Sequence, residues 1–365
     1  MPFPMSMKVT LTLAIALLAT AALAADAPKP AAAPVAPDKV DPLVRDALPV
    51  CGDVKITTSE MAHKLPPNMT GKVYQVESDR PSCQGQYVSI YSREGGFYLG
   101  IPWFLDDAEG DNVSDRLKSF TWKHMQEAFE PIIDHTPTRE GLYRVQLVQT
   151  TARGKLPLEG EVDGQGRIFF LGHFRPVKEG VQASRLKAFE PYLASSPTMG
   201  AAKPEVTVIE FSDFECPSCQ HAAGYLKPIM ARFGEKVRYI RYDLPLVTSH
   251  PWALSAALAG RAIYRQKPEV FWEFKKTIYE NQEKLNAFVI DEFTRGFAQD
   301  HDLDLAKYDA DVASEDLKAQ ILKGVGIAFS NDIRATPSYI INGALVDAGK
   351  DGERLEEYVA GLLKK

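Results

Sequence analysis

Cys216 and Cys219 are only three positions apart in the sequence, with Pro217 and Ser218 between them. Two thiols at this spacing on a helix are near enough to form a disulfide or to resolve a mixed one. The β-branched run at 206–211 predicts a buried strand, and the apolar spacing after Cys216 predicts a helix. Unpaired backbone N–H groups at the start of a helix favour a thiolate. We therefore expect Cys216 to be an acidic nucleophile, Cys219 to be the resolving thiol, and Pro217 and Ser218 to tune the redox potential.

The other two cysteines, Cys51 and Cys83, are far apart in the sequence, and we expect them to form a structural disulfide. A second redox pair is the alternative, but neither residue lies near a segment that resembles an activating helix start. One close and one distant cysteine pair, without histidines at ligand intervals, do not match a zinc site. The sequence also lacks the common motifs of phosphate-binding, hydrolase and metalloprotease sites. It therefore predicts no metal and no cofactor.

The first 24 residues predict a signal peptide. After Lys8, the segment from Leu11 to Ala24 is almost entirely apolar and ends in small residues at Ala22 and Ala24. A membrane anchor is the alternative, but the segment is shorter than the roughly 20 apolar residues that span a bilayer. We therefore expect a soluble protein in the periplasm. The formal charge of -6, without a basic stripe, argues against a nucleic-acid partner.

Composition divides the remaining chain into a tether and two domains. Residues 25–39 are rich in Ala and Pro, which favours a flexible tether. Residues 40–195 contain short alternating runs typical of strands, and helical spacing from about 114 to 133. They predict a strand-rich α+β domain. The small, polar segment at 194–204 predicts a linker, and residues 204–365 predict an α/β domain.

The second domain has a distinctive order of predicted elements. These are a strand at 206–211, a helix from Cys216 to Gly234 kinked at Pro228, a strand at 237–242, a helical block at about 249–330, a hairpin of 337–341 and 344–346, and a helix at 353–363.

Residues 204–365 resemble the exported thioredoxin-fold oxidoreductases of the DsbA-like group. The similarity lies in the segment from Glu210 to Cys219, in Thr336-Pro337, which resembles the cis-proline loop of that family, and in the helical block between them. The resemblance implies a thioredoxin fold with an inserted helical domain. It also implies a cis peptide bond before Pro337, opposite the disulfide, and a Thr336 that hydrogen-bonds the substrate backbone.

Glu210 is a carboxylate in an otherwise apolar strand, so burial should raise its pKa. The resemblance implies that it manages protons for Cys219. The alternative is a structural ion pair with Arg238 or Arg241. His221 lies on the same predicted helix as the cysteines, and we expect it to be solvated.

These features predict an exported thiol-disulfide oxidoreductase. Its substrates would be exported proteins that are reduced or that contain incorrect disulfide bonds. The resemblance suggests that a membrane redox protein regenerates its oxidised form. The long N-terminal domain leaves two alternatives open. One is a dimeric isomerase or reductase of the DsbC/DsbG type, because the segment from Asp163 to Gly172 loosely resembles the domain join of those proteins. The other is an envelope partner-binding protein with an accessory redox domain.

Overall fold

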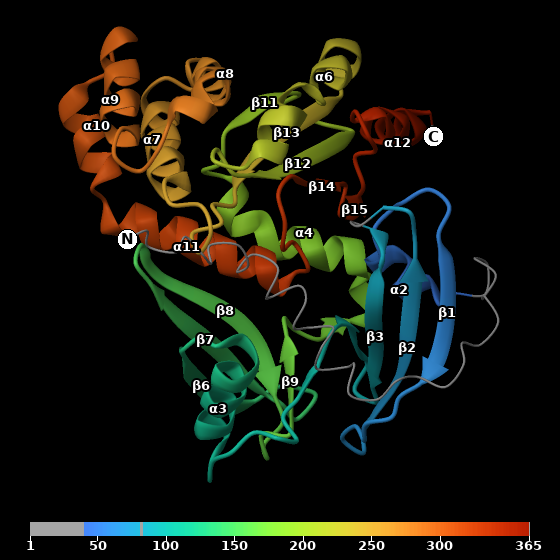
Figure 1. Ribbon diagram of the computed structural model, residues 1–365. Helices are drawn as coiled ribbons and strands as arrows, with labels where there is room; N and C mark the ends of the chain where they lie inside the picture. Colours follow the sequence, from blue (N-terminus) through green and yellow to red (C-terminus); the bar gives the residue numbers. More distant parts are fainter. Residues whose placement is uncertain (1–39, 81–82, 365) are drawn as a thin grey trace, which may run out of the picture.

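The computed structural model describes residues 40–80 and 83–364. The predicted signal peptide (1–24) and tether (25–39) lie outside the described residues. The described chain contains three five-stranded sheets, which pack with helices into one body (Figure 1). Within these residues, no helix combines the length and apolar character needed to cross a membrane.

The first sheet is antiparallel throughout. Its strands, in spatial order, are β1 (Lys55–Glu60), β2 (Met69–Glu77), β3 (Gly85–Ser92), β4 (Gly96–Gly100) and β10 (Arg175–Pro176). Helix α2 (Pro42–Ala47) begins at Asp41, whose side chain accepts a hydrogen bond from Leu43 N at 2.9 Å. Val44 of this helix is fully buried in the core of the sheet, so α2 covers one face.

The second sheet is also antiparallel and lies beside helix α3 (Val113–Met125). Its strands, in spatial order, are β5 (Trp103–Phe104), β9 (Ile168–Leu171), β8 (Gly154–Val162), β7 (Tyr143–Thr151) and β6 (Phe129–Pro137). The prediction of a helix from 114 to 133 was wrong in its second half. The helix ends where Gln126 adopts φ 54°, and Pro131, which cannot donate a helical hydrogen bond, lies in β6. Phe129 is buried and Ile132 is 57% exposed, as strand alternation requires.

The segment 194–204 is not the linker that we expected. Helix α4 (Val181–Leu193), preceded by a short helix η3 (Val177–Glu179), leads directly to β11 (Thr198–Gly200), which pairs with β13. The guanidinium of Arg261 hydrogen-bonds the side chains of Ser195 and Ser196, and Ser196 is only 1% exposed. These contacts hold the segment against the second domain.

The third sheet has the mixed topology of a thioredoxin fold. Its strands, in spatial order, are β11, β13 (Val237–Asp243), β12 (Val206–Ser212), β14 (Ser338–Ile341) and β15 (Ala344–Val346). Strand β12 runs parallel to β13 and antiparallel to β14. The predicted hairpin turns at Asn342 and Gly343, which have φ values of 46° and 90°. The predicted α/β class of this domain is therefore confirmed.

Helices surround the third sheet. They are α5 (Pro217–His221), η4 (Ala222–Gly224), α6 (Lys227–Phe233), α7 (Ala253–Gln266), α8 (Phe271–Asn281), η5 (Gln282–Lys284), α9 (Ile290–Asp300), α10 (Leu305–Val312), α11 (Glu315–Ser330) and α12 (Glu353–Leu363). Residues of α6 and α12 share one apolar core with one face of β12, and residues of α4 and α11 share another core with the opposite face. Helices α7 to α10 form the insertion beside the sheet (Figure 1).

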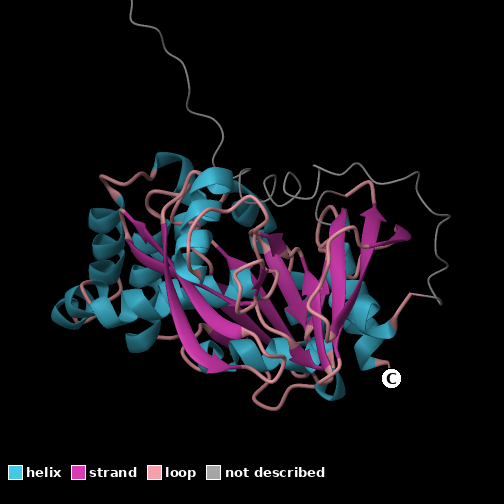
Figure 2. Cartoon of the chain, turned by 90° about the horizontal axis from the view of Figure 1, so that it is seen from below, coloured by secondary structure: helices cyan, strands magenta, loops and turns pink. Residues whose placement is uncertain are grey.

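The second and third sheets share one continuous core. Helix α11 lies directly on β8, and Figure 2 shows from below how helices pack against the strands. The approach is so close that a Cβ at Gly326 would collide with the carbonyl oxygen of Pro157. Ser330 Oγ also donates to Glu159 O at 2.9 Å. Since apolar burial is the main stabilising term, we expect this interface to unfold with the core rather than to act as a hinge.

Candidate active site

The two sulfurs of interest lie where β12 leads into α5. Cys216 is the N-cap residue of α5, and Pro217, with its fixed φ, occupies the first turn. Both thiols are free in the structure. Cys216 is 6% exposed, whereas Cys219 is 0% exposed and packs in the core of the helical insertion. An incoming thiolate can therefore reach only the sulfur of Cys216.

The pKa values of the two thiols move in opposite directions. A hydrogen bond from the Cys219 thiol lowers the pKa of Cys216 to about 6, against the effect of burial, with help from Thr336 and from the backbone N–H of Cys219. Burial raises the pKa of Cys219 well above its ordinary value, and the neighbouring Cys216 adds to this. At neutral pH the pair therefore holds a thiolate at Cys216 and a thiol at Cys219.

The loop before β14 lies opposite Cys216. The Thr336-Pro337 peptide bond is cis, and Cys216 Sγ lies 3.4 Å from Thr336 O. Pro217, Ser218, Thr336 and Pro337 all line one groove of about 880 Å³, which Pro49 of the N-terminal region also lines. The structure thus places together the four residues that the sequence analysis assigned to the cysteine pair and its substrate loop.

The N-terminal region is fixed to the edge of this groove. Val50 forms a parallel bridge to β15, and its N–H donates to a carbonyl of that strand at 2.7 Å. Cys51 and Cys83 form a disulfide with a Cα–Cα distance of 6.0 Å. Nearby, Arg80 Nη1 lies 2.8 Å from Asp347 Oδ1. The disulfide and the ion pair therefore hold the chain that follows Val50 close to the groove.

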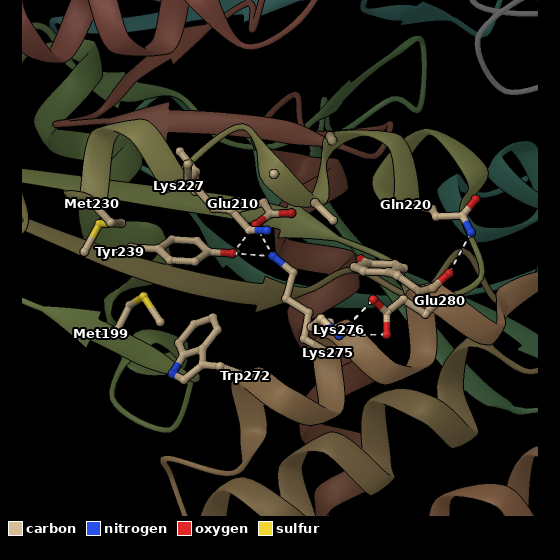
Figure 3. Close-up of a pocket in the computed structure, with 15 residues that line it drawn as sticks. Met199, Glu210, Gln220, Lys227, Met230, Tyr239, Trp272, Lys275, Lys276 and Glu280 are labelled. Carbon is tan, nitrogen blue, oxygen red and sulfur yellow. Dashed lines mark hydrogen bonds and ion pairs between the residues drawn. The ribbon is translucent and has the colours of Figure 1, made fainter. Parts of the chain in front are cut away.

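Glu210 has a different environment from the one we expected. Its Oε2 accepts hydrogen bonds from Lys275 Nζ at 2.9 Å and from Tyr239 OH (Figure 3). Its hydrogen-bonding partners therefore do not include Arg238 or Arg241. Strand alternation explains the contact, because Glu210 shares with Val206 and Val208 the face of β12 that α6 covers, while α8 supplies the lysine.

The expected rise in the pKa of Glu210 was wrong in direction. Burial does favour the neutral acid, but the charge of Lys275 and the hydrogen bond from Tyr239 outweigh it and hold the pKa below its ordinary value. Burial also lowers the pKa of Lys275. Both groups are nearly inaccessible, at 2% and 8% exposed. The site therefore contains a buried ion pair close to the cysteines rather than a neutral carboxylic acid.

The helical insertion contributes residues that the sequence analysis missed. Tyr279 OH lies 2.9 Å from Ser212 Oγ, beside the buried cysteine. Gln282 Nε2 donates to Cys216 O at 3.1 Å and to Phe214 O at 2.8 Å. These residues lie 60 or more positions from the cysteine motif. No local pattern marked them, so only the packing of the insertion could identify them.

A buried aspartate fixes the turn before the cysteines. Asp213 Oδ2 accepts from Leu246 N at 2.8 Å and lies 2.7 Å from His250 Nδ1. Burial opposes protonation of His250, but the hydrogen bond with Asp213 raises its pKa.

His221, in contrast, is exposed. Among residues 40–80 and 83–364, no group of three or more His, Cys, Asp or Glu side chains is arranged to hold a metal ion.

The helix after Cys216 is interrupted rather than simply kinked. Helix α5 ends at His221, the short helix η4 follows, and α6 begins at Lys227 with Pro228 in its first turn. Proline is well tolerated there because its missing N–H would be unpaired in any case. The interruption brings the small residues of η4 to the side of the active site that faces α8.

Comparison with known proteins shows what the second domain is similar to. A family model described as thioredoxin matches residues 194–360. Disulfide bond formation protein D of Bacillus subtilis is 24% identical over 185 residues, which is 48% of this chain and 80% of that protein. A probable disulfide bond formation protein D of Bacillus cereus is 28% identical over 177 residues, or 46% of this chain and 79% of that protein.

Other similarities are more limited. The Na(+)/H(+) antiporter NhaA 1 of Mycolicibacterium vanbaalenii is 30% identical over 138 residues, which is 38% of this chain but only 22% of the antiporter. The chain thus spans about a fifth of that protein, and the match assigns no transport activity. The crystal structure of BdbD from Bacillus subtilis aligns with 47% of this chain and 95% of its own, at 22% identity and a TM-score of 0.42.

Proposed function

We propose that this protein is an exported thiol-disulfide oxidoreductase, because residues 194–360 match a family model described as thioredoxin and the chain is similar to a probable disulfide bond formation protein D. It exchanges disulfides with protein substrates through Cys216 and Cys219. The observation that carries the proposal is the asymmetry of the two sulfurs. One is partly accessible with a pKa of about 6, and the other is buried and protonated. Its place of action is the periplasm, where the predicted signal peptide would direct it.

The reaction as an oxidase has two exchange steps. A substrate thiolate attacks Cys216 Sγ of the Cys216–Cys219 disulfide, so one substrate–enzyme S–S bond forms and Cys219 leaves as a thiolate. A second substrate thiolate then attacks the substrate sulfur of this mixed disulfide and releases Cys216 as a thiolate. The substrate loses two electrons and two protons, and the enzyme becomes the dithiol. The low pKa of Cys216 makes it a good leaving group in the second step.

Glu210 and Lys275 manage the proton in the first step. The departing Cys219 sulfur needs a proton because its pKa lies well above neutral. A negative charge on Cys219 favours the protonated form of Lys275, and Lys275 Nζ donates a hydrogen bond to Glu210 Oε2. We assign the supply of this proton to Lys275, the protonated member of the buried pair, which then regains a proton from solvent. A membrane redox protein would then reoxidise the dithiol, and the substrates would be reduced or misdisulfided exported proteins.

Redox titration of the full chain against glutathione tests the proposal. A potential more oxidising than about -180 mV argues for an oxidase, and one near -270 mV argues for a reductase. A Cys51→Ala/Cys83→Ala variant serves as control, because it should titrate like the wild type if the signal comes from Cys216 and Cys219. Loss of the titration in this variant would contradict the assignment.

A second candidate is an isomerase of the DsbC/DsbG type, or a protein that binds an envelope partner through its N-terminal domain. The observation that favours it is the contribution of Pro49 to the active-site groove. Rescue of scrambled ribonuclease and a dimer in sedimentation at micromolar concentration would support the isomerase. A monomer that oxidises reduced ribonuclease but rescues no scrambled protein would exclude it.

A further inference from the structure

The sulfur of Cys219 must carry a negative charge during the reaction in an enclosed part of the site. Cys219 is 0% exposed, so water does not reach this sulfur. When a thiolate attacks Cys216 Sγ, the electron pair of the broken S–S bond goes to Cys219 Sγ. A buried charge is very unfavourable unless hydrogen-bond donors face it. The groups that donate to Cys219 should therefore control the rate of this step.

Two donors from the end of β12 act on Cys219. Asp213 N, directly after the strand, donates to Cys219 Sγ at 3.5 Å. The side chain of Ser212, the last residue of β12, is the second donor. Burial raises the pKa of Cys219 most strongly, whereas hydrogen bonds from the Asp213 N–H and the Ser212 side chain lower it. A hydrogen bond lowers the pKa of a thiol when it favours the thiolate, so both groups favour the charged sulfur.

The inserted helix α8 holds the Ser212 hydroxyl in place. Tyr279 OH lies 2.9 Å from Ser212 Oγ, and both residues are buried, at 4% and 1% exposed. Burial and the charge on Cys219 raise the pKa of Tyr279 well above its ordinary value, so its OH group stays protonated. Asp213 O, the other acceptor for this proton, is farther away at 3.4 Å. Tyr279 therefore donates to Ser212 Oγ, which leaves the serine proton free to point at Cys219.

The contact between Tyr279 and Ser212 repeats the contact between Lys275 and Glu210. Lys275 and Tyr279 are four positions apart on α8, and Glu210 and Ser212 are two positions apart on β12. Both spacings correspond to about 6 Å and place the two residues on one face of their element. Lys275 Nζ lies 2.9 Å from Glu210 Oε2 (Figure 3), and Tyr279 OH lies at the same distance from Ser212 Oγ. The helix thus supplies a cation and a hydroxyl side by side to this face of the strand.

We infer, on the basis of the proposed oxidoreductase function, that Ser212 and Tyr279 form with Asp213 N–H a hydrogen-bonding site for the thiolate that leaves at Cys219. Ser212 is a catalytic residue because its hydroxyl donates to the reacting sulfur. Tyr279 is a positioning residue that acts through Ser212. Neither hydroxyl transfers its proton. The hydrogen bonds stabilise the thiolate until Lys275 protonates it.

The rate of the first exchange step measures this effect. The full chain is oxidised with oxidised glutathione and mixed with excess dithiothreitol. Acid quenching, alkylation and the mass of the peptide that contains Cys216 and Cys219 then follow the loss of their disulfide. We expect Ser212→Ala to slow this step at least about tenfold and Tyr279→Phe at least about threefold. The double variant should be no slower than Ser212→Ala, because Tyr279 acts only through the serine. Additive losses would contradict this order.

Two controls separate loss of the hydroxyls from a disturbed turn. Alkylation of Cys216 should keep its pH midpoint near the pKa of about 6 in every variant, because the side chains that lower this pKa are Cys219 and Thr336. A midpoint that moved together with the rate would show that the turn itself had changed and would overturn the assignment. Tyr308→Phe removes the hydroxyl of a similarly buried tyrosine from α10 of the same insertion and should leave the rate unchanged.

The outcomes distinguish this site from the function on which it rests. If folded Ser212→Ala or Tyr279→Phe reacts with dithiothreitol at the wild-type rate, the site is overturned, whatever the activity on protein substrates. If the wild type transfers no disulfide to reduced ribonuclease, the proposed function fails, whatever these rates are. Circular dichroism and melting temperature establish folding, and the rate of Tyr279→Phe decides if Ser212→Ala does not fold. Ser212→Thr keeps the hydroxyl and should retain more of the wild-type rate than Ser212→Ala. Equal losses in these two folded variants would contradict the role of the serine hydroxyl.

Discussion

Lys275 Nζ lies 2.9 Å from Glu210 Oε2, although 65 residues separate them in the sequence. The lysine comes from the inserted helix α8, and the glutamate from the central strand β12. The inserted helices therefore complete the charge balance beneath the cysteine pair. Removing either partner should leave an uncompensated charge in the buried interior of the protein.

Lys275→Met keeps much of the length of the side chain but removes its charge. We expect the free energy of unfolding to fall by about 3–5 kcal/mol at neutral pH, measured by urea denaturation. The matched control is Lys276→Met, whose ion pair with Glu280 is 67% and 57% exposed. That substitution should cost less than about 1 kcal/mol. Equal losses in both variants would contradict a special role for the buried pair.

The same variant should change the pH dependence of stability. In the wild type the folded pKa of Glu210 is lowered, so its contribution is present above the unfolded pKa of about 4.3 and is lost as the pH falls through the folded pKa. Without Lys275, burial should raise the folded pKa. The difference in unfolding free energy between wild type and variant should then shrink from neutral to acidic pH. A constant difference would show that Glu210 titrates alike in both proteins.

Cys219→Ala should make the remaining active-site thiol less acidic. The hydrogen bond from the Cys219 thiol is the largest cause of the low pKa of Cys216, so its loss should raise that pKa from about 6 toward the free value of about 8.5. The rate of alkylation by iodoacetamide as a function of pH gives the midpoint. Cys219→Ser keeps a donor and should shift the midpoint less. A wild-type midpoint near 8.5 would contradict the acidic thiolate.

Cys51→Ala/Cys83→Ala should lower the free energy of unfolding by about 3–4 kcal/mol, because the disulfide closes a loop across a sequence separation of 32. Denaturation of the variant beside the oxidised wild type measures the loss. A difference under about 1 kcal/mol would mean that the backbone hydrogen bonds of Val50 and the Arg80–Asp347 ion pair hold this segment without help from the disulfide.

Pro49→Trp should narrow the active-site groove from the N-terminal side. We expect the KM for a reduced protein substrate to rise severalfold, because the larger side chain would occupy space that the polypeptide needs. Alkylation of Cys216 by iodoacetamide should not change, since this reagent is small. If both reactions slowed equally, the substitution would have disturbed the cysteines themselves and the groove would carry no specificity.

The chemistry of this protein was largely predictable from one short segment. The strand at 206–211, the turn and the two cysteines are local features, and local hydrogen bonding decides most of their geometry. The hairpin at Asn342 was equally predictable, because Asn-Gly is a common sequence for turns whose residues have positive φ. In contrast, the spacing of apolar residues from 114 to 133 predicted one helix, whereas the structure has a helix followed by a strand. A few apolar residues at the end of such a segment fit the periodicity of a helix and of a strand equally well.

Local sequence was enough to identify the thiols that can react and the strand and helix that hold them. The partner of Glu210, the direction of its pKa shift and the contribution of Pro49 to the groove beside Thr336 depend on the packing of distant elements. The physical reason is that burial and electrostatic energies depend on which distant elements pack together. A cysteine motif is specified by neighbours along the chain, whereas an ion pair between β12 and α8 exists only after the insertion has folded against the sheet.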